Sequence, residues 1–127
     1  MKVPAHLMDF NEIVDLALKI AAELGFTLAE RGRLFGVQGS VGDNPDYLAR
    51  ELKELSHDRF DVEKRCNLVF GVNDSLEACY PNDLRQQKSW LEKSQEALAG
   101  KSCKALMSSG GLADLEQAAR FLEKCTA

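Results

Sequence analysis

Apolar residues recur every three or four positions along most of the chain, which is the spacing of an amphipathic helix. The first stripe of this kind predicts a helix of about four turns. Its members are Phe10, Ile13, Val14, Ala17, Ile20, Ala21 and Leu24. Asp9 followed by Glu12 is typical of a helix start, and Gly25 supplies a left-handed residue at the end. Thr27 and Glu30 repeat the capping pattern, so a shorter second helix follows directly.

A glycine-rich stretch, residues 36–43, comes next and is expected to be a loop. Asn44 before Pro45 has the pattern of an N-cap and a first helical residue. Leucines spaced four and three residues apart follow this pair, so they predict a third helix.

A fourth and longer helix is expected to begin at Asp58 or Asp61. It ends at Tyr80, because a residue that precedes a proline avoids the helical region. The apolar segment 66–72 is also compatible with a short buried strand, since periodicity does not separate the two structures in brief runs. We favour the helix.

Three short helices are expected in the remainder of the chain. Asn82 caps the first and Ser102 the second, while Gly110 and Gly111 separate the second from the last. The last apolar stripe consists of Leu112, Leu115, Ala119 and Leu122. With no alternating strand pattern and no hairpin turn, the sequence predicts an all-α fold of six or seven short helices.

Composition restricts the class of protein. With 127 residues, of which 45% are hydrophobic and 28% charged, the chain is expected to form one globular unit. We expect a cytoplasmic protein with no membrane partner, because it has neither a long apolar run nor an apolar stretch behind the N-terminus. The four cysteines lie far apart without a C-x-x-C pattern, so buried thiols are expected in place of zinc ligands or disulfides.

No residue pattern points to catalysis. His6 and His57 lie in polar segments, and the glycine-rich stretch has neither of the orders that cradle phosphates. The sequence therefore predicts a protein that is not an enzyme and uses no cofactor and no metal.

Two capped helices, a loop and a third helix follow the order of a helix-turn-helix, although two ordinary packed helices would show the same pattern. The residues expected to contact DNA on this interpretation are Arg31, Arg33, Gln38, Ser40 and Arg50. Residues 1–60 carry a net charge of −3 and residues 61–127 a net charge of −1. Any DNA contact must therefore come from a local basic patch.

The C-terminal half carries a family resemblance. A helix ending in Trp90-Leu91 leads to Leu98-x-Gly100-Lys101-Ser102, then to Leu106-Met107, a glycine break and a last amphipathic helix. This order resembles the toxin-binding domain of the MbcA/ParS/Xre antitoxin family. The chain departs from many members at Ser94-Gln95, where they have an Asn-Pro or Pro-Asn pair, and at Cys103, where they have proline.

The resemblance implies an Xre-like helix-turn-helix region in residues 1–57 and a toxin-binding region in residues 58–127. It further implies the antitoxin of a type II pair, which blocks the active site of a cognate RES-class, NAD-consuming or ADP-ribosylating toxin. Such a protein would form a homodimer or a toxin–antitoxin hetero-oligomer, and would also bind operator DNA to repress its own promoter. The alternatives are a free-standing helix-turn-helix regulator and a helical adaptor.

On this resemblance, the last helix and the preceding turn are expected to contact the toxin. The candidate residues are Trp90, Gly100, Lys101, Leu106, Met107, Arg120, Phe121, Leu122, Lys124 and Ala127 with its terminal carboxylate. Phe121 is expected to point outward, because other residues already fill the inward stripe of that helix.

Overall fold

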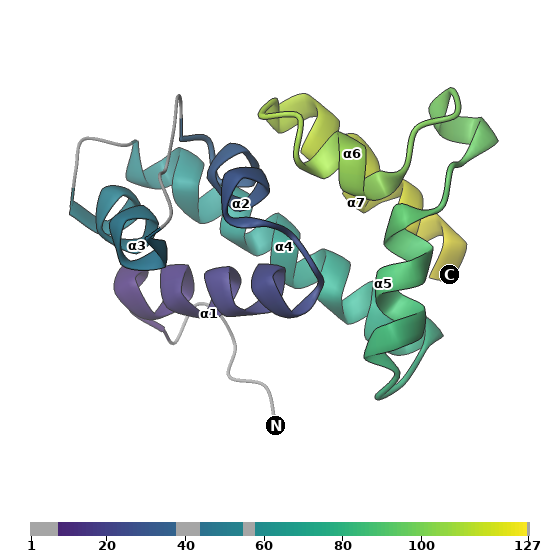
Figure 1. Ribbon diagram of the computed structural model, residues 1–127, viewed down its shortest axis with the longest axis horizontal. Coiled ribbons are helices and arrows are strands. Elements are labelled where there is room, and N and C mark those ends of the chain that lie inside the picture. The colour runs from purple at the N-terminus through teal and green to yellow at the C-terminus, as the bar shows by residue number, and fades with distance from the viewer. Residues whose placement is uncertain (1–7, 38–43, 55–57, 127) are drawn as a thin grey trace.

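The computed structural model describes residues 8–37, 44–54 and 58–126, and the regular structure within these ranges is helical (Figure 1). Its elements are α1 (Phe10–Glu23), α2 (Leu28–Leu34), α3 (Pro45–Glu54), α4 (Arg59–Cys79), α5 (Leu84–Glu92), the 3-10 turn η2 (Glu96–Leu98), α6 (Cys103–Met107) and α7 (Leu112–Thr126). These seven α-helices, with no strand in the described ranges, confirm the predicted all-α fold.

The first two helices begin where their capping residues predict. The Asp9 side chain accepts a hydrogen bond from the backbone N–H of Glu12, at 2.8 Å. Thr27 and Glu30 form a reciprocal capping box, in which each side chain accepts from the other residue's backbone N–H. Gly25, just past the end of α1, has a φ of +91°, which glycine adopts without steric strain.

Helix α4 decides where the fourth helix begins and whether segment 66–72 is a helix or a strand. Its N-cap is Asp58, whose side chain accepts from the N–H groups of Phe60 and Asp61. The helix continues through segment 66–72, so the strand alternative is wrong. The helical period places Cys66, Val69 and Val72 together on one buried face, whereas a strand would have divided them between two faces.

The prediction that Asn82 caps α5 is wrong by one residue. Asp83 is the N-cap and accepts from the N–H of Gln86 at 3.1 Å. Asn82 instead has a φ of +56°, and its N–H donates to the Glu77 carboxylate at 2.8 Å. Asparagine is one of the few residues that adopt this left-handed conformation readily, so it serves the turn between the helices.

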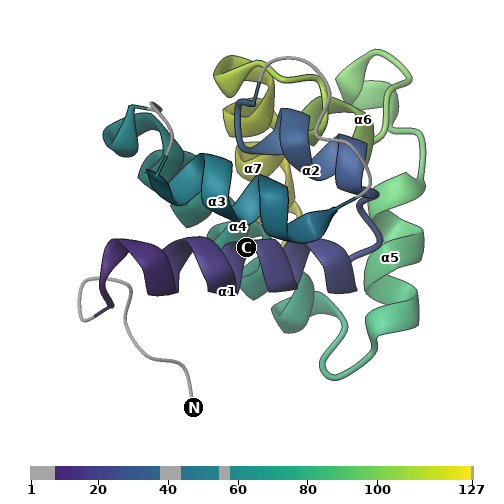
Figure 2. The same ribbon diagram turned by 60° about the vertical axis from the view of Figure 1, so that its left-hand side comes forward.

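Helix α4 runs through both halves of the molecule (Figure 1). It packs against α1 on the N-terminal side and against α7 on the C-terminal side, while α6 packs on α7 and α3 on α1. Figure 2 shows α1 and α3 lying next to each other, with α5 at the C-terminal end of α1. The predicted boundary between residues 57 and 58 falls directly before α4. The buried residues of α4 belong to a hydrophobic core cluster that contains residues from both sides of this boundary.

The size and polarity of the described helices bear on membrane insertion. None of them combines the length and the apolar character that a membrane crossing requires.

Candidate functional site

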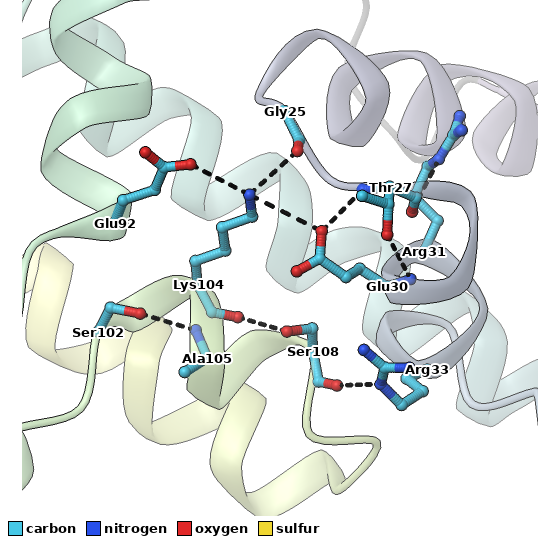
Figure 3. A network of polar contacts seen from close by, with 10 residues as sticks. All are labelled: Gly25, Thr27, Glu30, Arg31, Arg33, Glu92, Ser102, Lys104, Ala105 and Ser108. Carbon is cyan, nitrogen blue, oxygen red and sulfur yellow. Dashed lines mark hydrogen bonds and ion pairs between the residues drawn. The ribbon is translucent and has the colours of Figure 1, made fainter.

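A lysine links the two halves of the molecule. The Lys104 ammonium on α6 donates to the backbone oxygen of Gly25 at 3.1 Å and to the Glu92 carboxylate at 3.3 Å (Figure 3). It also pairs with Glu30 at 3.7 Å and lies 5.7 Å from the centre of the Phe26 ring. The side chains of Lys104 and Glu30 are only 16% and 22% exposed, so this pair is shielded from water more than a surface ion pair is. The Glu92 side chain is 63% exposed, so its contact with Lys104 lies at the surface.

The same network shifts the titration of Glu30. Partial burial acts to raise the pKa of this carboxyl group, but the N–H of Thr27 and the charge of Lys104 outweigh it. The pKa of Glu30 is therefore lower than its usual value of 4.5, and the carboxylate stays ionised near neutral pH.

Two arginines hold the turn between α6 and α7. Arg33 on α2 donates from Nε to the Ser108 carbonyl at 2.7 Å (Figure 3). The buried Arg65 on α4 pairs with Asp61 at 2.9 Å, and its Nη1 donates to the carbonyls of Leu34 and Gly110. The linking role of both arginines was not predicted from the sequence, because contacts between segments so far apart leave no local signal.

The DNA-contact candidates of the described chain lie in different surroundings. Arg33 is engaged with Ser108, and Arg31 donates to the Thr27 carbonyl in its own helix at 3.4 Å. Arg50 is exposed on α3, but the exposed residues of that helix include Asp46 and Glu54. Gln38 and Ser40 lie outside the described residues.

Two of the toxin-contact candidates meet. The rings of Trp90 on α5 and Phe121 on α7 stack with their centroids 6.1 Å apart and their planes at 25°. Both side chains are half-buried, so Phe121 faces neither fully outward nor fully into the core. The structure thus brings together two aromatic residues that are far apart in sequence and leaves part of each exposed.

Three other candidates are core residues. Leu106, Met107 and Leu122 are 5%, 1% and 1% exposed. In the folded chain they support α6 and α7 from within and present almost no surface to a partner, in contrast to the apolar contacts expected of them.

The remaining toxin-contact candidates are three basic residues, a glycine and the last residue of the chain. Arg120 and Lys124 are exposed along α7, and Arg120 donates to the Glu116 carbonyl at 3.4 Å. Lys101 is exposed beside Gly100, whose φ of +82° and N–H bond to the Gln95 carbonyl shape the loop before α6. Ala127 lies outside the described residues.

The described residues offer few groups for chemistry. They hold no group of three His, Cys, Asp or Glu side chains placed to bind a metal ion. Burial raises the pKa of the Cys66 thiol to about 12, with a further contribution from Glu63, and burial together with Cys125 raises that of Cys103 to about 12. These two thiols are therefore protonated at neutral pH and are poor nucleophiles. The candidate histidines, His6 and His57, lie outside the described residues.

The surface hollows of the described chain include one on α4 and one on α5. One, of about 390 Å³, lies on α4 between Phe60 and Leu68. The other, of about 450 Å³, lies at the start of α5 and is lined by Asp83, Arg85, Gln86 and Ser89. Neither contains a thiol or a histidine among its lining residues.

No protein-family model, curated protein or solved structure matches this chain. The resemblance to the antitoxin family therefore depends on the order of residues in its C-terminal half.

Proposed function

We propose that this protein is the antitoxin of a type II toxin–antitoxin pair, and that it inhibits a RES-class toxin by occupying the toxin's NAD-binding cleft. The observation that carries the proposal is the half-exposed stack of Trp90 on Phe121, beside the exposed end of α7. Partly exposed aromatic residues are typical anchors of a protein interface, because they bury a large area with little loss of conformational entropy.

The exposed end of α7 adds charge to this surface. Leu115, Ala118 and Leu122 fix the helix in the core, whereas residues 123–125 are exposed beyond them. Lys124 lies three residues after Phe121, so the two side chains leave the helix on neighbouring sides. An aromatic anchor next to an ammonium group suits a toxin cleft that combines apolar and acidic residues.

The test is co-expression with the adjacent open reading frame, with cell growth and cellular NAD as the readouts. We expect the neighbour to arrest growth and deplete NAD, and we expect this protein to restore both. Deleting the whole of α7 would remove Leu115 and Leu122 from the core, so the informative truncation ends at Leu122. That truncation, and the variant Phe121→Asp, should fail to restore growth.

A matched control changes an exposed cation elsewhere. Arg85→Glu, at the start of α5, should neutralise the toxin as well as the natural sequence does. A neighbour that is not toxic and forms no complex with this protein on size exclusion would overturn the proposal.

The second candidate is a free-standing helix-turn-helix regulator, favoured by the order of α1, α2 and α3 and by exposed Arg50. It ranks second, because Asp46 and Glu54 share the exposed surface of α3. Titration of a promoter fragment at increasing salt separates the two: a regulator binds it without a partner and more weakly as salt rises, and Arg50→Glu reduces that binding.

A further inference from the structure

A buried amide side chain attaches helix α5 to the end of α4. Gln87 is 3% exposed, although its neighbours Gln86 and Lys88 are exposed. Its Nε2 donates to Oε2 of the Glu77 carboxylate at 2.8 Å and to the carbonyl of Tyr80 at 2.9 Å. A glutamine amide has two hydrogens to donate, so both are used on the end of α4.

The Glu77 carboxylate connects this bond to the turn between the two helices. Its other oxygen, Oε1, accepts from the backbone N–H of Asn82 at 2.8 Å. One carboxylate therefore holds both the turn and the first half of α5. Because hydrogen bonds are directional and apolar contacts are not, this network fixes the angle at which α5 leaves α4.

The rest of α5 offers little that would fix its orientation. Its buried residues are Gln87 and Leu91, so one of its two buried side chains is polar. Leu91 lies four residues after Gln87, on the same side of the helix. An apolar anchor holds a helix against the core but lets it tilt, so the orientation of α5 depends on Gln87.

The Trp90 and Phe121 stack depends on that orientation. Trp90 lies three residues after Gln87 and therefore on the same side of α5. Phe121 belongs to α7, which Leu115 and Leu122 fix in the core separately from α5. A tilt of α5 on α4 would thus move Trp90 while Phe121 stays in place, and the two rings, with centroids 6.1 Å apart, would separate.

We infer that Glu77 and Gln87 are a positioning pair, which holds Trp90 against Phe121 in the arrangement that a partner contacts. Gln87 is buried, so it acts through Trp90 and does not touch the partner itself. The effect on toxin binding rests on the proposed function, whereas the effect on the stack does not.

Fluorescence tests the effect on the stack, because Trp90 is the single tryptophan of the chain. Gln87→Met keeps the length of the side chain but removes both hydrogen bonds. We expect the emission of Trp90 to move to longer wavelength and its quenching by acrylamide to increase, with the helical content in circular dichroism unchanged. The affinity for the toxin should fall by about tenfold or more, because an interface anchor is displaced.

A second variant gives the pair a signature in pH. Gln87→Glu places a carboxylate against that of Glu77, and two carboxylates in contact do not both ionise readily. The Trp90 emission should therefore be displaced at neutral pH and recover at about pH 5, where the two groups share a proton. Gln87→Met should show no such recovery.

The control for a general loss of stability is Leu48→Ala. Leu48 is buried on α3, which lies on the side of the molecule away from α5 (Figure 1). This variant should lower the melting temperature and leave the emission of Trp90 in the folded chain unchanged.

Three results would overturn the inference. The first is unchanged Trp90 emission and quenching in folded Gln87→Met, and the second is a signal in Gln87→Glu that does not respond to pH. The third is loss of the fold in both variants while Leu48→Ala stays folded, since the pair would then support the whole chain. A displaced stack with unchanged toxin affinity would overturn the effect on binding. Failure of the proposed function would appear separately, as a neighbour that is not toxic, and would leave the fluorescence result intact.

Discussion

Arg33 and Ser108 are joined by a hydrogen bond of 2.7 Å from the guanidinium Nε of the first to the backbone carbonyl of the second. Ser108 is the C-cap of α6, so its carbonyl belongs to the helix end, where oxygen atoms have no partner within the helix. A cation at this end satisfies the acceptor and interacts favourably with the helix dipole. The contact fixes α2 to α6 across the two predicted regions of the chain.

Replacing Arg33 by alanine should lower the free energy of unfolding by about 1 to 2 kcal/mol, because it leaves the partly buried carbonyl without this donor. Denaturant titration measures the change. Arg31→Ala is the control, since among the described residues Arg31 donates to the carbonyl of Thr27, the N-cap of its own helix. Its effect should stay within about 0.5 kcal/mol. Equal losses in the two variants would show that the link to Ser108 contributes nothing specific.

Stability should fall with acid in a way that depends on Glu30. The pKa of Glu30 is lower in the folded chain than its usual value of 4.5, so the unfolded chain takes up this proton first as the pH decreases. The contribution is present above pH 4.5 and is lost below it, as the pH passes through the folded pKa. Melting temperatures between neutral pH and about pH 3 should fall less steeply for Glu30→Gln than for the natural sequence. Parallel curves for the two proteins would contradict this.

The four thiols should react in two groups. Cys79 and Cys125 are exposed, whereas Cys66 and Cys103 are buried and their pKa values are raised to about 12. At about pH 8 a disulfide reagent such as Ellman's should modify the exposed pair quickly and the buried pair only after denaturation. Quick modification of all four thiols in the native protein would show that the core around α4 and α6 opens readily.

Residues of α7 should divide into those that support the fold and those that face outward. Leu122→Ala should destabilise the chain by about 2 to 5 kcal/mol, because it leaves a cavity in the core. Lys124→Ala should change stability by less than about 0.5 kcal/mol, since its side chain is exposed. Thermal or denaturant unfolding distinguishes them, and a strong loss in Lys124→Ala would mean that the end of α7 belongs to the folded core.

Gly36 should be difficult to replace with any other residue. Its φ is +85°, and a Cβ atom there would lie 3.0 Å from Nε of Arg65. Gly36→Ala should therefore destabilise the chain by about 1 kcal/mol or more, through backbone strain and displacement of the guanidinium. Gly71→Ala is the matched comparison and should have the opposite sign, because Gly71 lies within α4, where a Cβ atom would meet nothing within 4 Å and alanine favours the helix. A neutral result at Gly36 would show that Arg65 moves aside without loss of its bonds.

The helix starts and the all-α class could be predicted from the sequence alone. The helix starts at Asp9, Thr27 and Ser102 depend on a side chain that accepts from a backbone N–H three residues later. Such bonds form between neighbours in the chain, so residue types at fixed spacing are enough to predict them. The apolar stripes predicted an all-α fold for the same reason, because helical periodicity is a property of each segment by itself.

Only the tertiary structure decided which residues far apart in the chain meet, and which of the apolar residues remain at the surface. Lys104 reaches Gly25, and Trp90 stacks on Phe121, across separations that no local pattern encodes. Periodicity marks Leu122 as inward-facing, but the exposure of Phe60 and the half-burial of Phe121 depend on which helices pack over them. These outcomes depend on the summed packing of all the helices, because burial belongs to a position in the assembled core and not to a residue type.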